Sequence, residues 1–258
     1  MLNIAVKAAR RAGGIINRAT RNLDIIAVKE KAANDFVSAV DSEAEQAIIS
    51  TLREAYPGHS ILAEESGASG KSEYQWIIDP LDGTTNFAHA FPWFAVSIAL
   101  EEAGEIILGI VYQPYYEELF VAAKGQGATL NGQRLHVSAI NRLDRALLAT
   151  GFAPASTKSQ ANNFDHFIHF QEQAQACRRP GAASLDLACV AAGRFDGFWE
   201  MKLKPWDTAA GMLLVTEAGG RISDFAGAPF SPSHLECLAS NGLVHDAMIA
   251  ILQQGKRP

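Results

Sequence analysis

Apolar residues recur at helical spacing in the first part of the chain, which predicts an amphipathic opening helix. Its apolar positions are Ala5, Ala8, Ala9, Ala12, Ile15 and Ile16. Gly13 and Gly14 weaken this helix, at a cost of about 1 kcal/mol each relative to alanine. A second helix is predicted from about Asp41 to Ala55, where Tyr56-Pro57-Gly58 stops it. Its apolar positions are Ala44, Ala47, Ile48 and Leu52.

Short apolar segments separated by turn residues follow and predict a series of strands. They are Ser60 to Ala63, Tyr74 to Ile78, Phe94 to Leu100, Ile106 to Tyr112 and Leu119 to Ala123. Asn131-Gly132 is a strong hairpin signal. These strands lie close together in the chain, so the first half is predicted to be rich in sheet.

The second half alternates between strand and helix patterns. Strands are predicted at Ala146 to Thr150 and Phe195 to Glu200, and helices at Asn162 to Gln175 and about His245 to Gln254. Ser184 can cap a helix that ends at Gly193, and Asp207 can cap one that stops at Gly219-Gly220. Mixed elements that do not alternate strictly predict an α+β, layered arrangement. We expect two halves, 1–145 and 146–258, packed as one globular unit.

Composition and charge narrow the class of protein. The 258 residues are 48% hydrophobic and 19% charged, which is typical of a globular protein. Lys and Arg number 22 against 28 Asp and Glu, a net charge of −6, so we expect no nucleic-acid partner. The chain shows no 18-residue apolar run and no signal-peptide order, so no membrane association is expected. The cysteines, Cys177, Cys189 and Cys237, are far apart, which suits a reducing cytoplasm.

Carboxylates stand at predicted strand ends and helix starts. The acidic positions are Asp41, Glu64-Glu65, Asp79 with Asp82, and Glu200 with Asp207. If they converge, they cannot all stay ionised unless positive charge lies between them. Mg²⁺ is suited to this role because it prefers carboxylate, carbonyl and water oxygens.

The segment from Asp79 to Asn86, with the sequence DPLDGTTN, is the most informative. It follows the apolar run 76–78, so Asp79 and Asp82 can both bend toward one ion cluster, and the Leu81 carbonyl between them is a third oxygen ligand. The backbone N–H groups of Gly83 and Thr84 can open toward an anion, as at a helix N-terminus. Metal on one side and N–H donors on the other describe a phosphate site.

Each acidic position alone has a plainer interpretation. Asp82-Gly83 by itself is more typical of a turn, Asp41 and Asp207 of helix caps, and Glu64-Glu65 of a solvated loop. The complete eight-residue string is far more specific than any of its parts.

Two strings resemble the signatures of the inositol monophosphatase family: the segment 79–86 and Trp206-Asp207-Thr208-Ala209-Ala210-Gly211. Glu64-Glu65 stands where that family has its acidic pair, and the segments 125–132 and 193–197 are also similar to it. The resemblance covers about Ala5 to Leu252. It implies a layered α/β/α/β/α sandwich, a cytoplasmic homodimer and lithium-sensitive, Mg²⁺-dependent hydrolysis of phosphate monoesters, with inositol 1-phosphate as the substrate.

The resemblance also implies a role for each site residue. Glu64, Asp79 and the Leu81 carbonyl would bind one Mg²⁺, and Asp79, Asp82 and Asp207 a second. Glu64 and Asp79 could help to hold a third, weaker ion through waters. Thr84 would help to orient the attacking water, with Asp41 accepting its hydroxyl proton. Asp82, Gly83, Thr84, Ala183, Glu200 and Asp207 would surround the substrate, which reacts without a covalent intermediate.

Departures from the family pattern leave the substrate open. The family often has Gly-Ser-Ala-Ala where this chain has Gly181-Ala182-Ala183-Ser184, and Gln113 replaces an acidic residue or Asn before a proline. Lys202 and Lys204 could hold a second phosphate, although such residues are more often plain surface charges. The alternatives are phosphatases of fructose 1,6-bisphosphate, nucleotide 3′-phosphates, NADP or histidinol phosphate, or a regulatory protein on the same fold. A metal-dependent nuclease disagrees with the net charge of −6.

Overall fold

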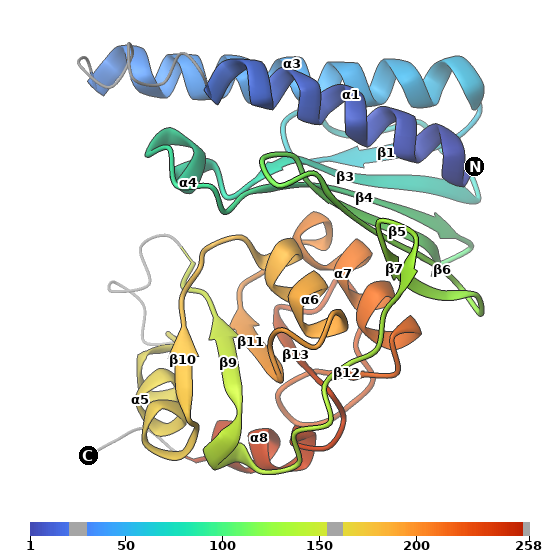
Figure 1. The fold of residues 1–258 in the computed structure, drawn as a ribbon. Coiled ribbons are helices and arrows are strands. Elements are labelled where there is room, and N and C mark those ends of the chain that lie inside the picture. The colour runs from blue at the N-terminus through green and yellow to red at the C-terminus, as the bar shows by residue number, and fades with distance from the viewer. Residues whose placement is uncertain (21–29, 154–161, 255–258) are drawn as a thin grey trace.

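The computed structural model describes residues 1–20, 30–153 and 162–254, with the backbone alone for 30–36. Its elements stack in five layers (Figure 1). Helices α1 (Leu2–Thr20) and α3 (Glu30–Ala55) lie outermost, on an eight-stranded sheet. Helices α6 (Ala183–Ala191) and α7 (Pro205–Glu217) separate this sheet from a five-stranded one, which α5 (Phe164–Gln173) and α8 (His245–Leu252) cover. The predicted α/β/α/β/α sandwich is therefore confirmed.

The first sheet is mostly an antiparallel meander with the strand order β2-β1-β3-β4-β5-β6-β7-β8. Short turns join the strands from β4 to β8, whereas residues 83–94 connect β3 to β4. Among the described strands of this sheet, β1 and β3 alone run parallel. The strands are β1 (Ser60–Ala63), β2 (Gly67–Ser69), β3 (Tyr74–Asp82), β4 (Ala95–Glu102), β5 (Glu105–Gln113), β6 (Glu118–Ala123), β7 (Gly127–Leu130) and β8 (Gln133–Arg134).

The second sheet has the strand order β10-β9-β11-β13-β12. Strand β9 is parallel to both β10 and β11, while β13 is antiparallel to β11 and β12. The strands are β9 (Leu147–Thr150), β10 (Ala176–Arg178), β11 (Gly197–Met201), β12 (Arg221–Ser223) and β13 (Glu236–Ser240). The short 3₁₀ helix Leu143–Arg145 precedes β9.

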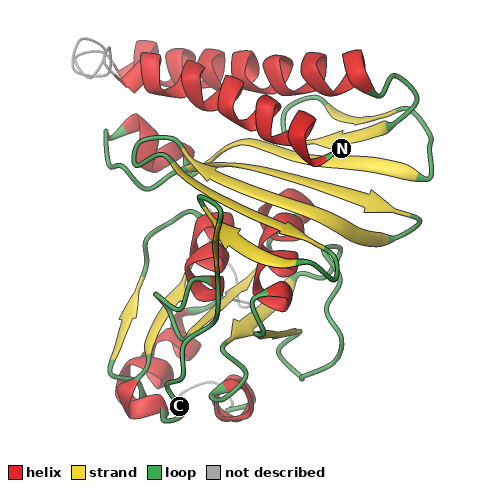
Figure 2. Ribbon diagram, turned by 45° about the vertical axis from the view of Figure 1, so that its right-hand side comes forward, coloured by secondary structure: helices red, strands yellow, loops and turns green. Residues whose placement is uncertain are grey.

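The central helices are buried between the two sheets, as the rotated view also shows (Figure 2). All nine residues of α6 are buried, so this helix is apolar around most of its circumference. Two glycines permit the close packing. A Cβ on Gly211 of α7 would lie 2.5 Å from the Cβ of Leu187, and one on Gly109 of β5 would lie 2.7 Å from the Ala210 carbonyl oxygen. The glycine of the second signature is therefore a packing residue.

Three acidic positions sit differently in their elements from the prediction. Helix α3 begins at Glu30, so Asp41 lies in its interior and does not cap it. Strand β3 continues through Asp82, because Asp82 still pairs with Ala95 of β4 after a shift in register that follows Asp79. Helix α7 begins at Pro205, so Asp207 is its third residue. Its carboxylate accepts the N–H of Lys204, the residue before the helix, as in a capping box.

Ser184 also differs from the prediction. Helix α6 begins at Ala183, so Ser184 is its second residue and Ala182 is the cap position. The hydroxyl of Ser184 bonds to a distant carboxylate and is not engaged in capping. Within the described residues, no helix is long and apolar enough to cross a membrane.

Candidate active site

Glu64 and Asp79 are brought side by side by the parallel pairing of β1 with β3. Ala63 of β1 pairs with Ile78 of β3, so the next residue on each strand emerges at the same place. The N–H of Glu64 donates to the Ile78 carbonyl at 3.1 Å, which extends this register by one residue. The N–H of Leu81 donates to Oδ1 of Asp79 at 3.0 Å. Local backbone bonding therefore fixes both carboxylates at one edge of the sheet.

Burial raises the pKa values of the carboxylates, and the neighbouring negative charges add to this effect. Asp79 is only 2% exposed, and burial raises its pKa well above the usual range. The charges of Glu64, Asp82, Asp207 and Asp41 raise it further, in that order. Burial, followed by the charge of Asp82, raises the pKa of Asp207 to about 7. Four of the predicted metal ligands therefore meet in one acidic cluster.

Asp82 is held by the N-terminus of α6, which lies about a hundred residues further along the chain. Its Oδ2 accepts the N–H of Ser184 at 2.8 Å and the hydroxyl of Ser184 at 2.5 Å. Burial raises the pKa of Asp82, while the bonds from Ser184 and the N–H groups of Ala183 and Leu185 lower it. The helix end thus stabilises the ionised carboxylate.

The turn after Asp82 presents backbone N–H groups. Gly83 has φ +93°, and a Cβ there would lie 2.8 Å from the Trp93 carbonyl oxygen, so the position requires glycine. Helix α4 (Thr84–Ala88) starts immediately after it. Its first N–H groups lack partners within the helix, as an anion site requires.

Thr84 and Asp41 are not hydrogen-bonded to each other in the described structure, contrary to the direct contact that the sequence implied. The Thr84 hydroxyl donates instead to the Leu81 carbonyl at 3.1 Å, because the turn places that oxygen three residues away. Oδ1 of Asp41 is buried and has no hydrogen-bond partner among the described residues. Burial, followed by the charges of Glu64, Glu65 and Glu45, raises the pKa of Asp41 to about 8.

Glu45 is a site-supporting residue that the sequence analysis missed. It is 1% exposed and lies one turn after Asp41 on α3. Its carboxylate accepts the N–H groups of Glu65 and Ser66, at 2.9 and 3.0 Å. Glu45 therefore fixes the loop that carries Glu64. Its spacing of four from Asp41 was the available signal, since i and i+4 share a helix face.

A cavity of about 380 Å³ opens beside the acidic cluster, within the range of roughly 300–1,000 Å³ for small-molecule sites. Ala183 and Glu200 lie on its wall with Glu64, Asp82 and Asp207. Burial, then the charges of Asp207 and Asp82, raises the pKa of Glu200 to about 8. The other lining residues include the cations Arg179, Lys202 and Lys204 and the aromatic rings of Phe152 and Trp206.

The chemistry of these donors suits Mg²⁺, which prefers carboxylate and carbonyl oxygens. Among the described residues, no group of three or more His, Cys, Asp or Glu side chains is arranged to hold a metal ion. The Leu81 carbonyl supplies a further hard oxygen next to Asp79, and Mg²⁺ normally retains several waters. The buried carboxylates repel one another, and Oδ1 of Asp41 has no hydrogen-bond partner among the described residues. A bound cation would stabilise the ionised form of such a cluster.

The layered sandwich and the acidic cluster beside its cavity are together typical of the inositol monophosphatase fold. The model of the inositol monophosphatase family matches residues 1–257, and the chain belongs to this family. The solved structure of inositol monophosphatase from Anabaena superposes with a TM-score of 0.91 at 41% identity, over 100% of this chain and 96% of that one.

Proteins named Nus factors are also similar to this chain. The chain is 48% identical to Nus factor SuhB of Pseudomonas aeruginosa, over 98% of this chain and 96% of the relative. It is 49% identical to Nus factor SuhB of Escherichia coli, over 97% and 94%. The structure of extragenic suppressor protein suhB from Bartonella henselae matches with a TM-score of 0.88 at 38% identity, over 98% of this chain and 99% of that one.

Proposed function

We propose that this chain is a Mg²⁺-dependent phosphomonoesterase that hydrolyses inositol 1-phosphate to inositol and phosphate. The convergence of Glu64, Asp79, Asp82 and Asp207 beside a small-molecule cavity carries the proposal. A phosphate monoester is a dianion at neutral pH and would be repelled by these carboxylates alone. Bound cations invert the local field, so the same cluster then attracts the substrate.

The chain's own oxygens divide into two sets in this proposal. Glu64, Asp79 and the Leu81 carbonyl would hold one ion, and Asp79, Asp82 and Asp207 a second, with a weaker third near Glu64 and Asp79. When bound, the ions supply Lewis acidity and a nucleophilic water for an in-line displacement. Ser184 and the N-terminus of α6 keep Asp82 ionised and oriented for this role.

The remaining residues position the substrate. The N–H groups of Gly83 and Thr84 would bind phosphate oxygens at the start of α4. Thr84 and Asp41 would orient the attacking water between them, since Oδ1 of Asp41 can accept a further hydrogen bond. On the cavity wall, the Glu200 carboxylate would accept hydrogen bonds from substrate hydroxyls, and the backbone at Ala183 would donate one to them. The rate then comes mainly from positioning and charge neutralisation.

The first test is phosphate release from a substrate panel, with Mg²⁺ and with a chelator. The panel contains inositol 1-phosphate, fructose 1,6-bisphosphate, NADP, adenosine 3′,5′-bisphosphate and histidinol phosphate. We expect Mg²⁺-dependent release from inositol 1-phosphate well above the rest. Preference for another member would keep the reaction and change the substrate, and no release from any member would overturn the phosphatase proposal.

Asp207→Asn tests the site itself. It should keep the fold and reduce kcat by orders of magnitude, because a neutral amide is a poor ligand for Mg²⁺. Asp144→Asn is the matched control, since Asp144 is exposed, pairs with Arg142 and does not line the cavity. Near-wild-type turnover of Asp207→Asn would contradict the proposed metal ligands.

The names of the relatives favour a second candidate function. Proteins 48–49% identical over nearly the whole chain are named Nus factors. We infer that this chain also acts as a binding factor through surfaces outside the acidic site. In a strain that lacks the chain, Asp207→Asn should restore growth if this role dominates, and should fail if catalysis dominates. A homodimer, a cytoplasmic location and the absence of nucleic acid stay predictions.

A further inference from the structure

The outermost helix α1 is basic along its whole length. It carries Lys7, Arg10, Arg11 and Arg18 and no acidic residue, in a chain whose net charge is −6. The four ion pairs found in the described part of the chain join other cations to carboxylates, and none includes a residue of α1. This helix therefore presents unneutralised positive charge on an otherwise acidic protein.

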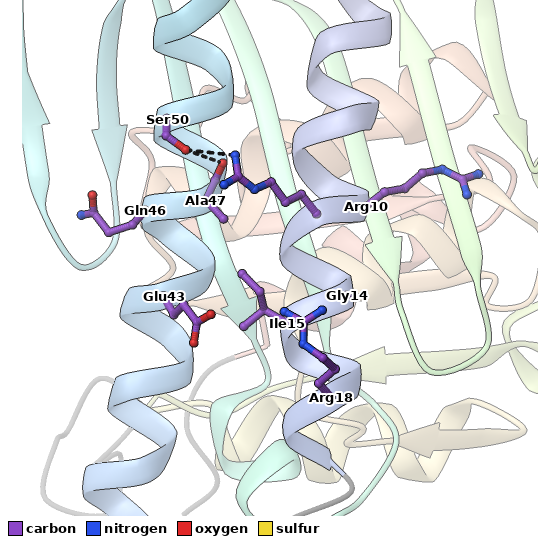
Figure 3. Close-up of a pocket in the computed structure, with 9 residues that line it drawn as sticks. Arg10, Gly14, Ile15, Arg18, Glu43, Gln46, Ala47 and Ser50 are labelled. Carbon is purple, nitrogen blue, oxygen red and sulfur yellow. Dashed lines mark hydrogen bonds between the residues drawn. The ribbon is translucent and has the colours of Figure 1, made fainter.

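A groove of about 720 Å³ runs between α1 and α3 on the outer surface (Figure 3). Its floor is formed by Gly14, Ile15 and Ala47, which are small or already buried. The α1 side carries arginines, and the α3 side carries polar residues at a spacing that places them on one helix face. The remaining lining residues are Arg10, Arg11 and Arg18 on α1, and Glu43, Gln46 and Ser50 on α3.

Two arginines line the groove, and hydrogen bonds hold one of them in place. Nη1 of Arg11 donates to the hydroxyls of Ser50 and Thr51, at 3.3 and 3.2 Å, so the guanidinium bridges from α1 to α3. The side chain of Arg18 folds back along α1, and its Nη1 would lie 3.6 Å from a Cβ on Gly14. Arg10 extends away from α3, with its guanidinium 6.0 Å from the ring centre of Tyr112.

We propose that this groove binds an acidic helix of a partner protein. Arg11 and Arg18 are seven residues apart, so they lie on one face of α1 and are separated by about 10.5 Å along its axis. Carboxylates at positions i and i+7 of an incoming helix have the same spacing. A third helix can also pack into the groove between two packed helices, because its side-chain ridges fit such grooves. Guanidinium groups and carboxylates then pair in the bidentate geometry that arginine favours.

The lining favours protein over nucleic acid. Binding of single-stranded nucleic acid relies on aromatic platforms for the bases, and the groove is lined by no aromatic residue in the described structure. Glu43 lies opposite the arginines and would repel a continuous phosphate backbone. It can instead form an ion pair with a lysine of a helix that carries both charges. The partner is therefore defined as a helix with carboxylates on one face.

The groove is separate from the acidic site, although α3 contributes to both. Asp41 and Glu45 of α3 are buried against the sheet, whereas Glu43, Gln46 and Ser50 are exposed on the groove side. Changes to Arg11 and Arg18 should therefore leave phosphate release unchanged, so the surface and the proposed phosphatase can be tested independently.

The experiment introduces the photo-crosslinking residue p-benzoylphenylalanine at Gln46 of the full chain, in the cells that normally make it. Adducts formed under light are digested and mapped by mass spectrometry. We expect a protein adduct on a helical segment with Asp or Glu at positions i and i+7. A synthetic peptide of that segment should bind the wild-type chain at least tenfold more tightly than the double variant Arg11→Glu/Arg18→Glu, with weakening at higher salt.

A matched control separates the groove from general electrostatics. Arg53→Glu/Arg145→Glu makes the same change in net charge at exposed arginines outside the groove, and it should bind the peptide like the wild type. The proposal is overturned if the adduct is RNA, a second copy of this chain or a segment without acidic character. It is equally overturned by no adduct, or by a control that loses binding as the groove variant does.

Discussion

The hydroxyl of Ser184 donates a 2.5 Å hydrogen bond to Oδ2 of Asp82, joining the second residue of α6 to the end of β3. Both side chains are buried, Ser184 fully. The family pattern Gly-Ser-Ala-Ala would place an alanine at position 184, so the hydroxyl that the sequence analysis regarded as displaced supports a proposed metal ligand. One oxygen of Asp82 is thereby committed to α6, which leaves Oδ1 for the acidic cluster.

Ser184→Ala tests this relationship. A hydrogen bond to a charged group contributes about 1.5–3 kcal/mol, and the backbone N–H groups of residues 183–185 still donate to Asp82, so we expect a folded protein. The affinity for Mg²⁺, measured by calorimetry, should fall several-fold because Asp82 is less firmly oriented. Ser60→Ala is the control, since Ser60 is equally buried but donates to the Tyr74 carbonyl away from the cluster. Equal Mg²⁺ affinity in both variants would disprove the positioning role.

The adjacent glycines of α1 should respond in opposite directions to alanine. A Cβ on Gly13 would lie far inside van der Waals contact with the Tyr112 ring, so Gly13→Ala should destabilise the chain by about 1–3 kcal/mol. A Cβ on Gly14 would meet only Arg18, at 3.6 Å, so Gly14→Ala should stabilise it by about 0.5–1 kcal/mol. Urea unfolding of the two variants measures both changes, and the same sign for both would contradict the packing.

His245 should make the chain sensitive to mild acid. It is fully buried between the hydroxyls of Ser223 and Ser240, at 2.9 and 2.8 Å, and burial, followed by the charge of Arg221, lowers its pKa to about 4. The unfolded chain binds this proton near pH 6.5 and the folded chain only near pH 4. Stability therefore falls as the pH drops through this window, by about 3 kcal/mol in total.

The comparison with His245→Gln isolates this contribution, because other titrating groups are common to both proteins. The free energy of unfolding of the wild type should decrease between pH 6.5 and 4 more steeply than that of the variant. Parallel pH profiles would show that His245 is not the responsible group.

Removal of a carboxylate should stabilise the metal-free chain. Asp79 is buried among four other acids, so Asp79→Asn removes repulsion and should raise Tm in chelator by several degrees. The same variant should lose most of the Tm increase that Mg²⁺ gives to the wild type, because ligand binding stabilises the folded state in proportion to affinity. A lower Tm in chelator would argue against mutual repulsion in the cluster.

Local patterns along the sequence were sufficient for most elements. The strand at Ser60–Ala63 was predicted with its observed bounds, and the opening helix was also found, because short-range apolar spacing encodes both. The predictions that failed concern where helices begin. Helix α3 starts eleven residues before Asp41, and Asp207 is the third residue of α7, where its carboxylate accepts the N–H of Lys204.

By itself the sequence determined the layered fold and the identities of the acidic residues, since signatures and apolar periods are local properties of the chain. Only the tertiary structure decided how these residues meet. The parallel register of β1 and β3 sets Glu64 beside Asp79, and the N-terminus of α6 reaches Asp82 across 102 residues. The groove beside Arg11 and Arg18 exists only because α1 and α3 pack together. Such contacts join residues distant in sequence, and their geometry depends on the packing of the whole fold.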